Sequence, residues 1–351
     1  MGDSTETVSG HVDAKASLPL YPTLFPFVLT VVSCRLLPES VLCPMVVMIV
    51  GKQEDLTSVY IQEKVARRGI ETLMFNTTLF PYQHKLTYDI DAPANGSVRQ
   101  WPETRAIAFS EIKGVFRRWS DGVKVPDSEQ DPLRWRLVYR NLESAVNCFF
   151  RSLDSAIWVN TAQATDEHRL KVNLLQTLRQ QGVRVPDTLV TCQPEDFRHF
   201  YQKWDGNIIM KPVLGWADTE RVTAEHCSDE ALKLLENMPV KLQEFIPGTD
   251  IRIYLIKDEL FPVEIQSKTV DFRNDPYAPR VPITLPDAVA QTCFQIAQTL
   301  GLVYAGIDMR RTPAGEYVFF EANPTPVFLY DEEASGYPIS DCLVDLLVSR
   351  C

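Results

Sequence analysis

The sequence predicts a mixed fold, in which an α/β part is followed by an α+β part built on an antiparallel sheet. Over residues 45–160, apolar strands alternate with amphipathic helices, and this order favours a parallel sheet covered by helices. Farther along the chain, strands follow one another with few helices between them, which favours antiparallel pairing. The 351 residues allow two or three domains, each large enough to bury a core.

The α/β part is expected to begin at Met45 with a buried strand. The helix that follows ends at two arginines and a glycine, which suit the negative end of a helix dipole and a helix stop. A polar stretch that ends near Trp101 separates the second strand from the third. The expected strands are 46–51, 70–75, 112–119 and 156–160, and the expected helices are 58–69 and about 134–153.

The α+β part is expected to open with one helix over residues 165–182, which ends at Gly182. Cys148 and Cys293 are expected to pack as small apolar residues on helices. The further strands are expected at 187–192, 207–213, 240–245, 250–258 and 260–266.

The first 44 residues differ in character from the rest of the chain. Residues 1–18 are polar and without periodicity, and residues 19–44 are apolar but interrupted by prolines. We expect this segment to be a disordered extension outside the folded core.

Composition excludes several classes of function. Lys and Arg number 35 against 46 Asp and Glu, so the net charge of −11 argues against a nucleic-acid partner. The longest uninterrupted apolar stretch of the N-terminal segment, residues 27–34, is too short to span a bilayer, so no membrane partner is expected. The eight cysteines include no C-x-x-C pair, which favours reduced thiols in a cytoplasmic protein.

A predicted hairpin near the end of the chain carries the most informative polar residues. If Ala314 and Gly315 form a two-residue loop, Asp308 lies directly opposite Glu321, and Asn323 lies on the same face as Glu321. Like charges in this position destabilise a sheet unless a cation lies between them. Two carboxylates and an amide oxygen suit Mg²⁺ that is shared with substrate phosphates. The alternative is an exposed hairpin face with scattered acids, against which the apolar neighbours of Glu321 argue.

Cationic residues stand where such a metal would need phosphates. Lys211 ends an apolar strand, and Lys171 lies on the helix expected at 165–182, although either could be an ordinary surface lysine. None of the five histidines falls in the hairpin, so none is assigned a catalytic role. A strand end that could offer backbone groups to an adenine edge carries Gln243 and Glu244, followed by Asp250 and Arg252.

Four motifs occur in the order and spacing of the ATP-grasp superfamily: KVNLLQ (171–176), IIMKPV (208–213), LQEFIPGTDIR (242–252) and GIDM…FFEANP (306–324). The chain resembles ligases of the RimK and glutathione-synthetase type. It is most similar to the ATP-grasp maturases of microviridin-type ribosomal peptides, the graspetides. The resemblance implies a pre-ATP-grasp domain at 45–160, a central lid domain at 161–245 and a C-terminal antiparallel-sheet catalytic domain at 246–351.

The resemblance also implies roles for single residues. Lys171 and Lys211 would contact nucleotide phosphates, and Asp250 would bind the ribose. The adenine would lie against the segment Gln243, Glu244, Phe245 and Ile246. Asp308, Glu321 and Asn323 would hold Mg²⁺, or Mn²⁺ in its place. Arg252, Arg273 and Arg310 would stabilise the transferring phosphoryl group, or each could be a structural ion pair.

Two segments depart from the pattern of these families. The loop after Lys211, VLGWADTERV (213–222), has one glycine where many ATP-grasp enzymes have a glycine-rich loop, so Trp216 is a candidate lid residue. Microviridin-type ligases usually continue Asn-Pro with Asn-Gly-Gln-Trp, whereas this chain has Thr325-Pro326-Val327-Phe328. The second departure lies beside the expected reacting centre and leaves the nucleophile open.

The activity implied is ATP-dependent joining of a carboxylate to an alcohol or amine through an acyl phosphate. The expected substrate is a precursor peptide with a leader segment, in which lactone or lactam crosslinks form. One alternative is a RimK-like ligase that joins free amino acids or adds them to a peptide or protein. Another is an inactive ATP-grasp module that binds nucleotide or peptide. The resemblance also implies a homodimer.

Overall fold

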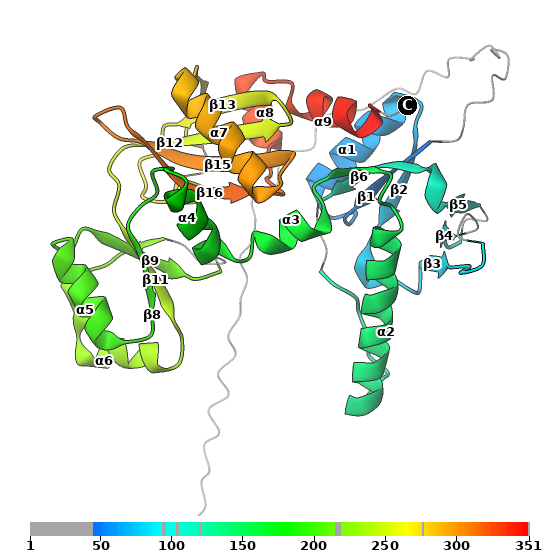
Figure 1. Cartoon of the computed structure of the whole chain (residues 1–351), viewed down its shortest axis with the longest axis horizontal. Coiled ribbons are helices and arrows are strands. Elements are labelled where there is room, and N and C mark those ends of the chain that lie inside the picture. The colour runs from blue at the N-terminus through cyan, green and yellow to red at the C-terminus, as the bar shows by residue number, and fades with distance from the viewer. Residues whose placement is uncertain are drawn as a thin grey trace, which may run out of the picture. The chain divides into compact units, whose positions relative to one another are not determined.

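The computed structural model describes residues 45–92, 96–102, 105–118, 121–214, 219–275 and 277–349 (Figure 1). The expectations for residues 1–44 and for a lid at Trp216 fall outside the described residues. No helix among the described residues is long and apolar enough to cross a membrane.

A parallel four-stranded sheet forms the first part of the structure, as the sequence predicts. Its order is β2-β1-β6-β7, so β1 has its sequence neighbour on one side and β6 on the other. Asp55 caps the first helix through a hydrogen bond from Ser58 N (2.8 Å). The bounds are β1 Val46–Val50, α1 Leu56–Arg67, β2 Glu71–Phe75, β6 Ile112–Arg117, α2 Pro132–Arg151 and β7 Ile157–Val159.

The polar stretch before β6 contains a small antiparallel sheet that sequence periodicity did not indicate. Its strands are β3 His84–Thr87, β4 Ser97–Gln100 and β5 Ala106–Ala108. Val98 and Ile107 reach the core beneath the parallel sheet, and these two apolar positions are too few to register as strand periodicity.

The single helix predicted at 165–182 is wrong, because the structure has two helices there. These are α3 Ala162–Glu167 and α4 Lys171–Gln180, with His168, Arg169 and Leu170 between them. Leu170 has φ −85° and ψ 50°, which is outside the helical region. The break turns His168 and Lys171 toward Glu321, so tertiary contacts outweigh the helical periodicity.

A second four-stranded sheet of order β10-β9-β11-β8 follows and has its own hydrophobic core. Phe197 and Phe200 of its first helix pack against Ile208 and Leu242 of its strands. The bounds are β8 Thr188–Thr191, α5 Pro194–Lys203, β9 Ile208–Pro212, β10 Glu220–Arg221, α6 Asp229–Leu232 and β11 Val240–Glu244.

The predicted antiparallel sheet is confirmed as a five-stranded sheet of order β14-β13-β12-β15-β16. Cys148 and Cys293 both lie on helices, as predicted, but only Cys293, on the helix that covers one face, is buried, whereas Cys148 is exposed on α2. The bounds are β12 Thr249–Ile256, β13 Glu259–Ile265, β14 Arg280–Pro282, α7 Asp287–Leu300, β15 Tyr304–Arg311, β16 Tyr317–Asn323, α8 Leu329–Ser335 and α9 Ile339–Val348.

The β15–β16 hairpin pairs Asp308 with Glu321, as predicted, but by a different route. The loop is longer than two residues, because Thr312 N–H donates to the carbonyl oxygen of Glu316 (2.8 Å). A β-bulge at Phe320 then restores the register, so that Met309 pairs with Phe319 while Asp308 pairs with Glu321. The two deviations from the predicted hairpin cancel at the two acids.

The C-terminal helix α9 packs back on the first part of the structure (Figure 1). Leu343 and Leu347 share one apolar core with Val47 and Ile49 of β1. At the rim of this contact, Lys64 Nζ lies 2.8 Å from Asp341 Oδ1. The parallel sheet and the end of the chain therefore form one continuous core.

Candidate active site

A cavity of about 1160 Å³ opens beside the β15–β16 hairpin. Most of the polar residues singled out from the sequence line it, although they come from widely separated parts of the chain. The lining includes Arg117 and Arg118, His168 and Lys171, Lys211 and Lys241, Phe245, Ile246 and Asp250, Arg252, Asp271 and Arg273, and Asp308, Arg310, Phe320, Glu321 and Asn323.

The two hairpin carboxylates carry opposite electrostatic perturbations. Burial raises the pKa of Asp308 to about 7, although the charge of Arg252 opposes this shift. Burial would also raise the pKa of Glu321, but hydrogen bonds from His168 and Lys171 bring it well below its usual range. Lys171 Nζ donates to Glu321 Oε1 (2.8 Å), and His168 Nε2 lies 3.3 Å from the same oxygen.

His168 therefore lines the cavity beside Glu321, although it lies outside the hairpin in the sequence. It reaches Glu321 because it stands in the break between α3 and α4. In a continuous helix through residues 165–182, the positions of His168 and Lys171 would be set by the helical repeat alone, without the break that turns them toward Glu321. The sequence carries no clear signal for the break, because the apolar positions of α4 are spaced as they would be in one longer helix.

The oxygen set on the hairpin fits a magnesium ion. Asp308 and Glu321 face each other across the strands, and Asn323 lies two residues farther along β16. Asn323 Oδ1 accepts a hydrogen bond from Thr325 N (2.9 Å), which fixes the side chain at the end of the strand. Among the described residues, no cluster of three or more His, Cys, Asp or Glu side chains has the arrangement of a metal site. An ion here would take two carboxylates and an amide, with oxygens of a substrate completing its shell.

A pair of buried lysines lies on the neighbouring sheet. Lys211 of β9 and Lys241 of β11 are directly opposite each other on antiparallel strands, and both line the cavity. Burial lowers the pKa of Lys211 to about 8 and that of Lys241 to about 7, and their mutual repulsion contributes to the shift at Lys241. Lys241 was missed from the sequence, although it shares the signal that singled out Lys211, a lysine within an apolar strand.

The end of β11 and the two residues that follow it have different roles. Phe245 and Ile246 line the cavity and give it an apolar wall. Gln243 and Glu244 do not line it: Gln243 Nε2 donates to Thr188 Oγ1 (2.9 Å), and Glu244 accepts from Arg184 Nη2 (2.6 Å). The side chains of Gln243 and Glu244 therefore hold the strand end in place.

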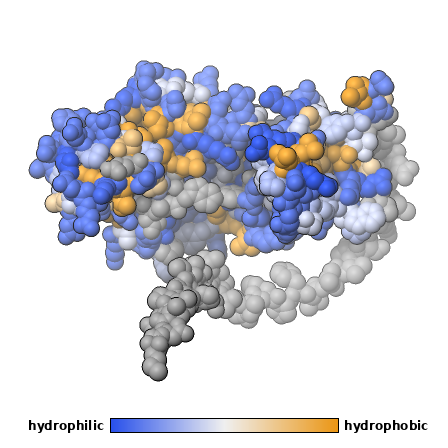
Figure 2. All heavy atoms as spheres, turned by 90° about the horizontal axis from the view of Figure 1, so that it is seen from below, coloured by the Kyte–Doolittle hydropathy of each residue, from blue (hydrophilic) through white to orange (hydrophobic). Residues whose placement is uncertain are grey.

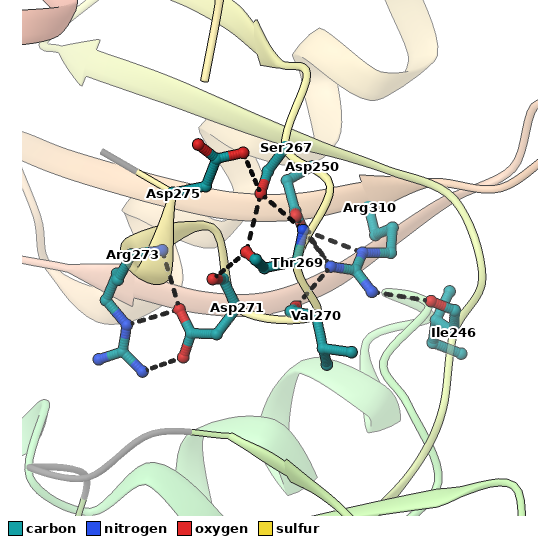
Figure 3. Close-up of polar contacts among 9 residues, drawn as sticks. All are labelled: Ile246, Asp250, Ser267, Thr269, Val270, Asp271, Arg273, Asp275 and Arg310. Atoms are coloured by element: carbon teal, nitrogen blue, oxygen red, sulfur yellow. Dashed lines mark hydrogen bonds and ion pairs between the residues drawn. The ribbon is translucent and has the colours of Figure 1, made fainter. Parts of the chain in front are cut away.

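Arg310 is the most completely engaged of the three arginines singled out from the sequence (Figure 3). It forms a forked pair with Asp250, with Nε and Nη2 donating to Asp250 Oδ1 at 2.9 and 2.7 Å. Its remaining donors reach the carbonyl oxygens of Ile246 (3.1 Å) and Val270 (3.2 Å). Arg310 thus ties the end of β11 to β12 and to the loop after β13.

The other two arginines are placed differently. Arg273 forms a forked pair with Asp271 on the loop after β13 (Figure 3). Arg252 Nη1 lies 3.2 Å from Asp308 Oδ1, but without hydrogen-bonding geometry, and neither Nε nor Nη1 has a hydrogen-bond partner among the described residues. A buried guanidinium with unused donors is a binding group for an anion.

Comparison with known families assigns both parts of the chain. Residues 168–347 match the RimK-like ATP-grasp domain, and residues 46–166 match the MvdD pre-ATP grasp domain. The α-aminoadipate–LysW ligase LysX of Sulfurisphaera tokodaii is 25% identical over 190 residues, which cover 50% of this chain and 65% of LysX. The ribosomal protein bS6–L-glutamate ligase of Salmonella paratyphi B is 27% identical over 197 residues, which cover 53% of this chain and 65% of that ligase.

Solved structures match over more of the chain. The ATP-grasp ligase PsnB in complex with a minimal precursor has a TM-score of 0.73 and 26% identity, covering 87% of this chain and 98% of PsnB. The macrocyclase MdnC of Microcystis aeruginosa MRC, bound with the precursor peptide MdnA, has a TM-score of 0.75 and 24% identity, covering 87% of this chain and 99% of MdnC. The ATP-grasp fold expected from the motifs is thereby confirmed. Because the RimK-like match alone covers half of the chain, this protein belongs to the RimK-like ATP-grasp family and carries an MvdD-type pre-ATP-grasp domain before it.

Proposed function

We propose that this protein is an ATP-dependent ligase that forms ester or amide crosslinks between side chains of a ribosomally made precursor peptide. The observation that carries the proposal is the convergence in one cavity of the Asp308–Glu321 pair, the Lys211–Lys241 pair and the guanidinium of Arg252. Acids, lysines and an arginine buried together are costly unless ligands of complementary charge complete them. A nucleotide, a divalent cation and a substrate carboxylate supply those charges.

The nucleotide has a defined place in this proposal. Its phosphates contact Lys171, Lys211 and Lys241, and its base lies against the apolar wall at Phe245 and Ile246. The ribose hydroxyls reach Asp250, whose carboxylate Arg310 holds in a fixed orientation. Gln243 and Glu244 support this wall from behind.

Asp308, Glu321 and Asn323 would hold a divalent metal ion, Mg²⁺ or Mn²⁺ in its place. When bound, the ion neutralises charge on the phosphate oxygens. Lys171 and His168 compensate Glu321 in the structure, and Arg252 compensates Asp308. With an ion at the carboxylates, these cationic side chains would be available to contact a phosphate.

The reaction has two steps. A carboxylate oxygen of the substrate attacks the γ-phosphorus in line, the bond to the β-bridging oxygen breaks, and ADP leaves. A hydroxyl or amine then attacks the acyl carbon, loses its proton, and expels inorganic phosphate. Arg252 stabilises the charge on the transferring group, and Arg273 lies at the rim where it can do the same. Arg310 acts through Asp250 as a positioning residue.

The peptide substrate is favoured by the likeness to a ligase that was solved with a peptide. PsnB in complex with a minimal precursor is 26% identical and aligns over 87% of this chain. The RimK-like alternative, in which a free amino acid is the nucleophile, is favoured by the sequence likeness to the ribosomal protein bS6–L-glutamate ligase. An inactive binding module is the third alternative.

Mass spectrometry after incubation with ATP, Mg²⁺ and a candidate precursor peptide separates these outcomes. Loss of one water per crosslink, with matching release of phosphate, is the result expected. Gain of an amino-acid residue by the peptide supports the RimK-like alternative, and nucleotide binding without phosphate release supports the binding module.

Conservative substitutions test the metal site in the same assay. Asp308→Asn and Glu321→Gln are expected to lower the rate at least about a hundredfold, because each removes a charged ligand. Glu316→Gln is the matched control, since Glu316 lies on the same hairpin but outside the cavity lining. Full activity in Asp308→Asn would refute the metal assignment.

A further inference from the structure

The parallel sheet offers a second binding position at its topological switch point. Because β1 has β2 on one side and β6 on the other, the chain leaves the carboxyl ends of β1 and β6 in opposite directions. A crevice forms outside strand ends of this kind, and α/β proteins bind ligands there. Arg117 ends β6 at this point, and Arg118 follows it, with both lining the large cavity.

The helix end at the crevice already has an anionic partner. Asp55 caps α1 by accepting from Ser58 N (2.8 Å), and its Oδ2 lies 3.3 Å from Arg118 Nε. Arg118 Nη1 also donates to the carbonyl oxygen of Thr325 (2.5 Å). Arg118 therefore connects the parallel sheet to the segment that follows Asn323, and its charge is compensated.

Arg117 is not compensated in the same way. Its guanidinium is largely buried, and its Nη1 has no hydrogen-bond partner among the described residues. Its nearest acid is Asp166, at 3.7 Å from Nη2, beyond hydrogen-bonding distance. Burial lowers the pKa of Arg117, and the charge of Arg169 lowers it further. Arg117 thus has one exposed acid, Asp166, beside it and the like charge of Arg169 nearby.

We propose that Arg117, assisted by Arg169, binds a carboxylate of the substrate other than the one that is phosphorylated. The inference rests on the proposed function, since it places an acidic segment of the peptide between the switch point and the Asp308–Glu321 pair. The planar fork of an arginine matches a carboxylate with two parallel hydrogen bonds. A single negative charge also suits this wall better than a phosphate, because Asp166 and Glu143 both line it.

The test is binding of fluorescein-labelled hexaglutamate to the full chain in the presence of Mg·ADP, followed by fluorescence anisotropy. Arg117→Gln is expected to weaken binding at least about tenfold, whereas Arg117→Lys is expected to lose less because it keeps the charge. Labelled hexaglutamine is expected to bind no variant measurably. Arg134→Gln is the matched control, because Arg134 is an exposed arginine of the same domain outside the cavity lining.

Each outcome bears on the subsite separately from the ligase function. An equal loss in Arg134→Gln and Arg117→Gln would mean that only overall charge matters, and this refutes the subsite. Unchanged binding in Arg117→Gln, or no binding of hexaglutamate by the native chain, refutes it too. Mg·ADP affinity, measured by calorimetry on every variant, tests the nucleotide site independently. If Arg117→Gln does not fold, Arg117→Lys decides the question. Hexaglutamate binding is then measured for this variant and for the native chain at increasing salt, and equal affinities at every salt concentration would refute the forked contact.

Discussion

Gly306 shows how closely single residues are fitted around Arg252. A Cβ atom at position 306 would lie 2.7 Å from Pro326 Cβ and 2.8 Å from Arg252 Nη1. Both distances are shorter than side-chain atoms tolerate, so Arg252 or the segment after Asn323 must shift. The segment that departs from the microviridin-type pattern is thus packed directly against a proposed catalytic group.

Gly306→Ala is therefore expected to slow ligation at least about tenfold, because small displacements at a reacting centre are costly. Mg·ADP affinity should stay within about threefold of the native value, since the shifted groups lie away from the lysines. Gly182→Ala is the control: its φ of 87° strains any side chain, but nothing lies within 4 Å of the added atom. Equal rates for Gly306→Ala and the native chain would contradict the close fit.

The Lys211–Lys241 pair predicts a pH dependence of nucleotide binding. In the free protein, burial holds the pKa of Lys241 at about 7, so the side chain is largely neutral above that pH. Phosphate groups favour the charged form and raise this pKa, so binding takes up a proton and affinity falls as pH rises above about 7. Calorimetry of Mg·ADP binding at pH 8 in buffers of different ionisation enthalpy measures the uptake. Lys241→Met should reduce it, and unchanged uptake in this variant would contradict the assignment.

At the scale of elements, the bulge at Phe320 decides which side chains face the cavity. Phe320 lies beside both Lys211 and Arg310, whose cationic groups are 5.7 and 6.0 Å from its ring centre. The bulge brings this ring to the same side as Glu321, whereas Phe319 stays in the opposite core. A regular hairpin would supply the acids without the ring.

Deleting Phe320 is therefore expected to close the bulge and keep Asp308 opposite Glu321. Mg·ADP binding should survive, weakened by loss of the ring. Deleting Ala322 should abolish Mg·ADP binding, because Asn323 then turns to the other face of the sheet. Titration calorimetry on both variants, with circular dichroism to check folding, measures the difference. Equal binding by the two deletions would contradict the role of the register.

His84 on β3 predicts the acid stability of the small sheet. The ring is buried against Phe75, its Nε2 accepts from Asn76 N (3.1 Å), and burial lowers its pKa to about 4. Between pH 6.5 and 4 the unfolded chain therefore binds the proton that the folded chain excludes. As the pH falls through this window, His84 lowers the free energy of unfolding by up to about 1.4 kcal/mol per pH unit.

His84→Gln should flatten that part of the pH profile, because glutamine can still accept the hydrogen bond without titrating. Urea unfolding at several pH values measures the effect, and His199→Gln, at an exposed position, is the control. If the free energy of unfolding depended on pH equally steeply in the native chain and in His84→Gln, the His84 ring would not be the source of the acid sensitivity.

The elements were predictable from the sequence to different extents. Most strands of the two larger parts and the two acids of the proposed metal site follow from local signals, namely apolar runs, a turn and register, whereas β3–β5 have too few apolar positions to be predicted. Lys241 carries the same local signal as Lys211, a lysine in an apolar strand, whereas the place of His168 depends on where a helix breaks, which a single sequence does not encode locally. Phe320 was expected only as part of a buried sheet, because a bulge has no reliable composition signal.

At the scale of the whole molecule, the hydrophobic cores do not follow the predicted three-part division. Tyr254 and Tyr304 of the antiparallel sheet share a core with Val47 of the parallel sheet. The sheet formed by β8–β11 has a core of its own around Phe200. Figure 2 shows hydrophobic residues in separate patches on a largely hydrophilic face.

Hydrogen exchange should therefore report two cooperative units. Phe200→Ala is expected to speed exchange in residues 188–244 alone, whereas Leu347→Ala should speed it in β1 and β12 together, because each removes a buried side chain from its own core. Peptide-resolved mass spectrometry distinguishes the two patterns. If Leu347→Ala affected only α9 and its immediate contacts, the shared core would not be a cooperative unit.

The position of α9 has a consequence for how the protein is made. β1 and α1, whose Ile61 and Val65 lie in the same core, are translated well before Leu343 and Leu347 of α9, which complete that core. The part of the core that α9 completes stays open until those residues are made, and its apolar side chains are available for non-native association. Production of this protein at low temperature or with a chaperone should thus improve its yield, and a messenger truncated before the codons for α9 should yield an insoluble product.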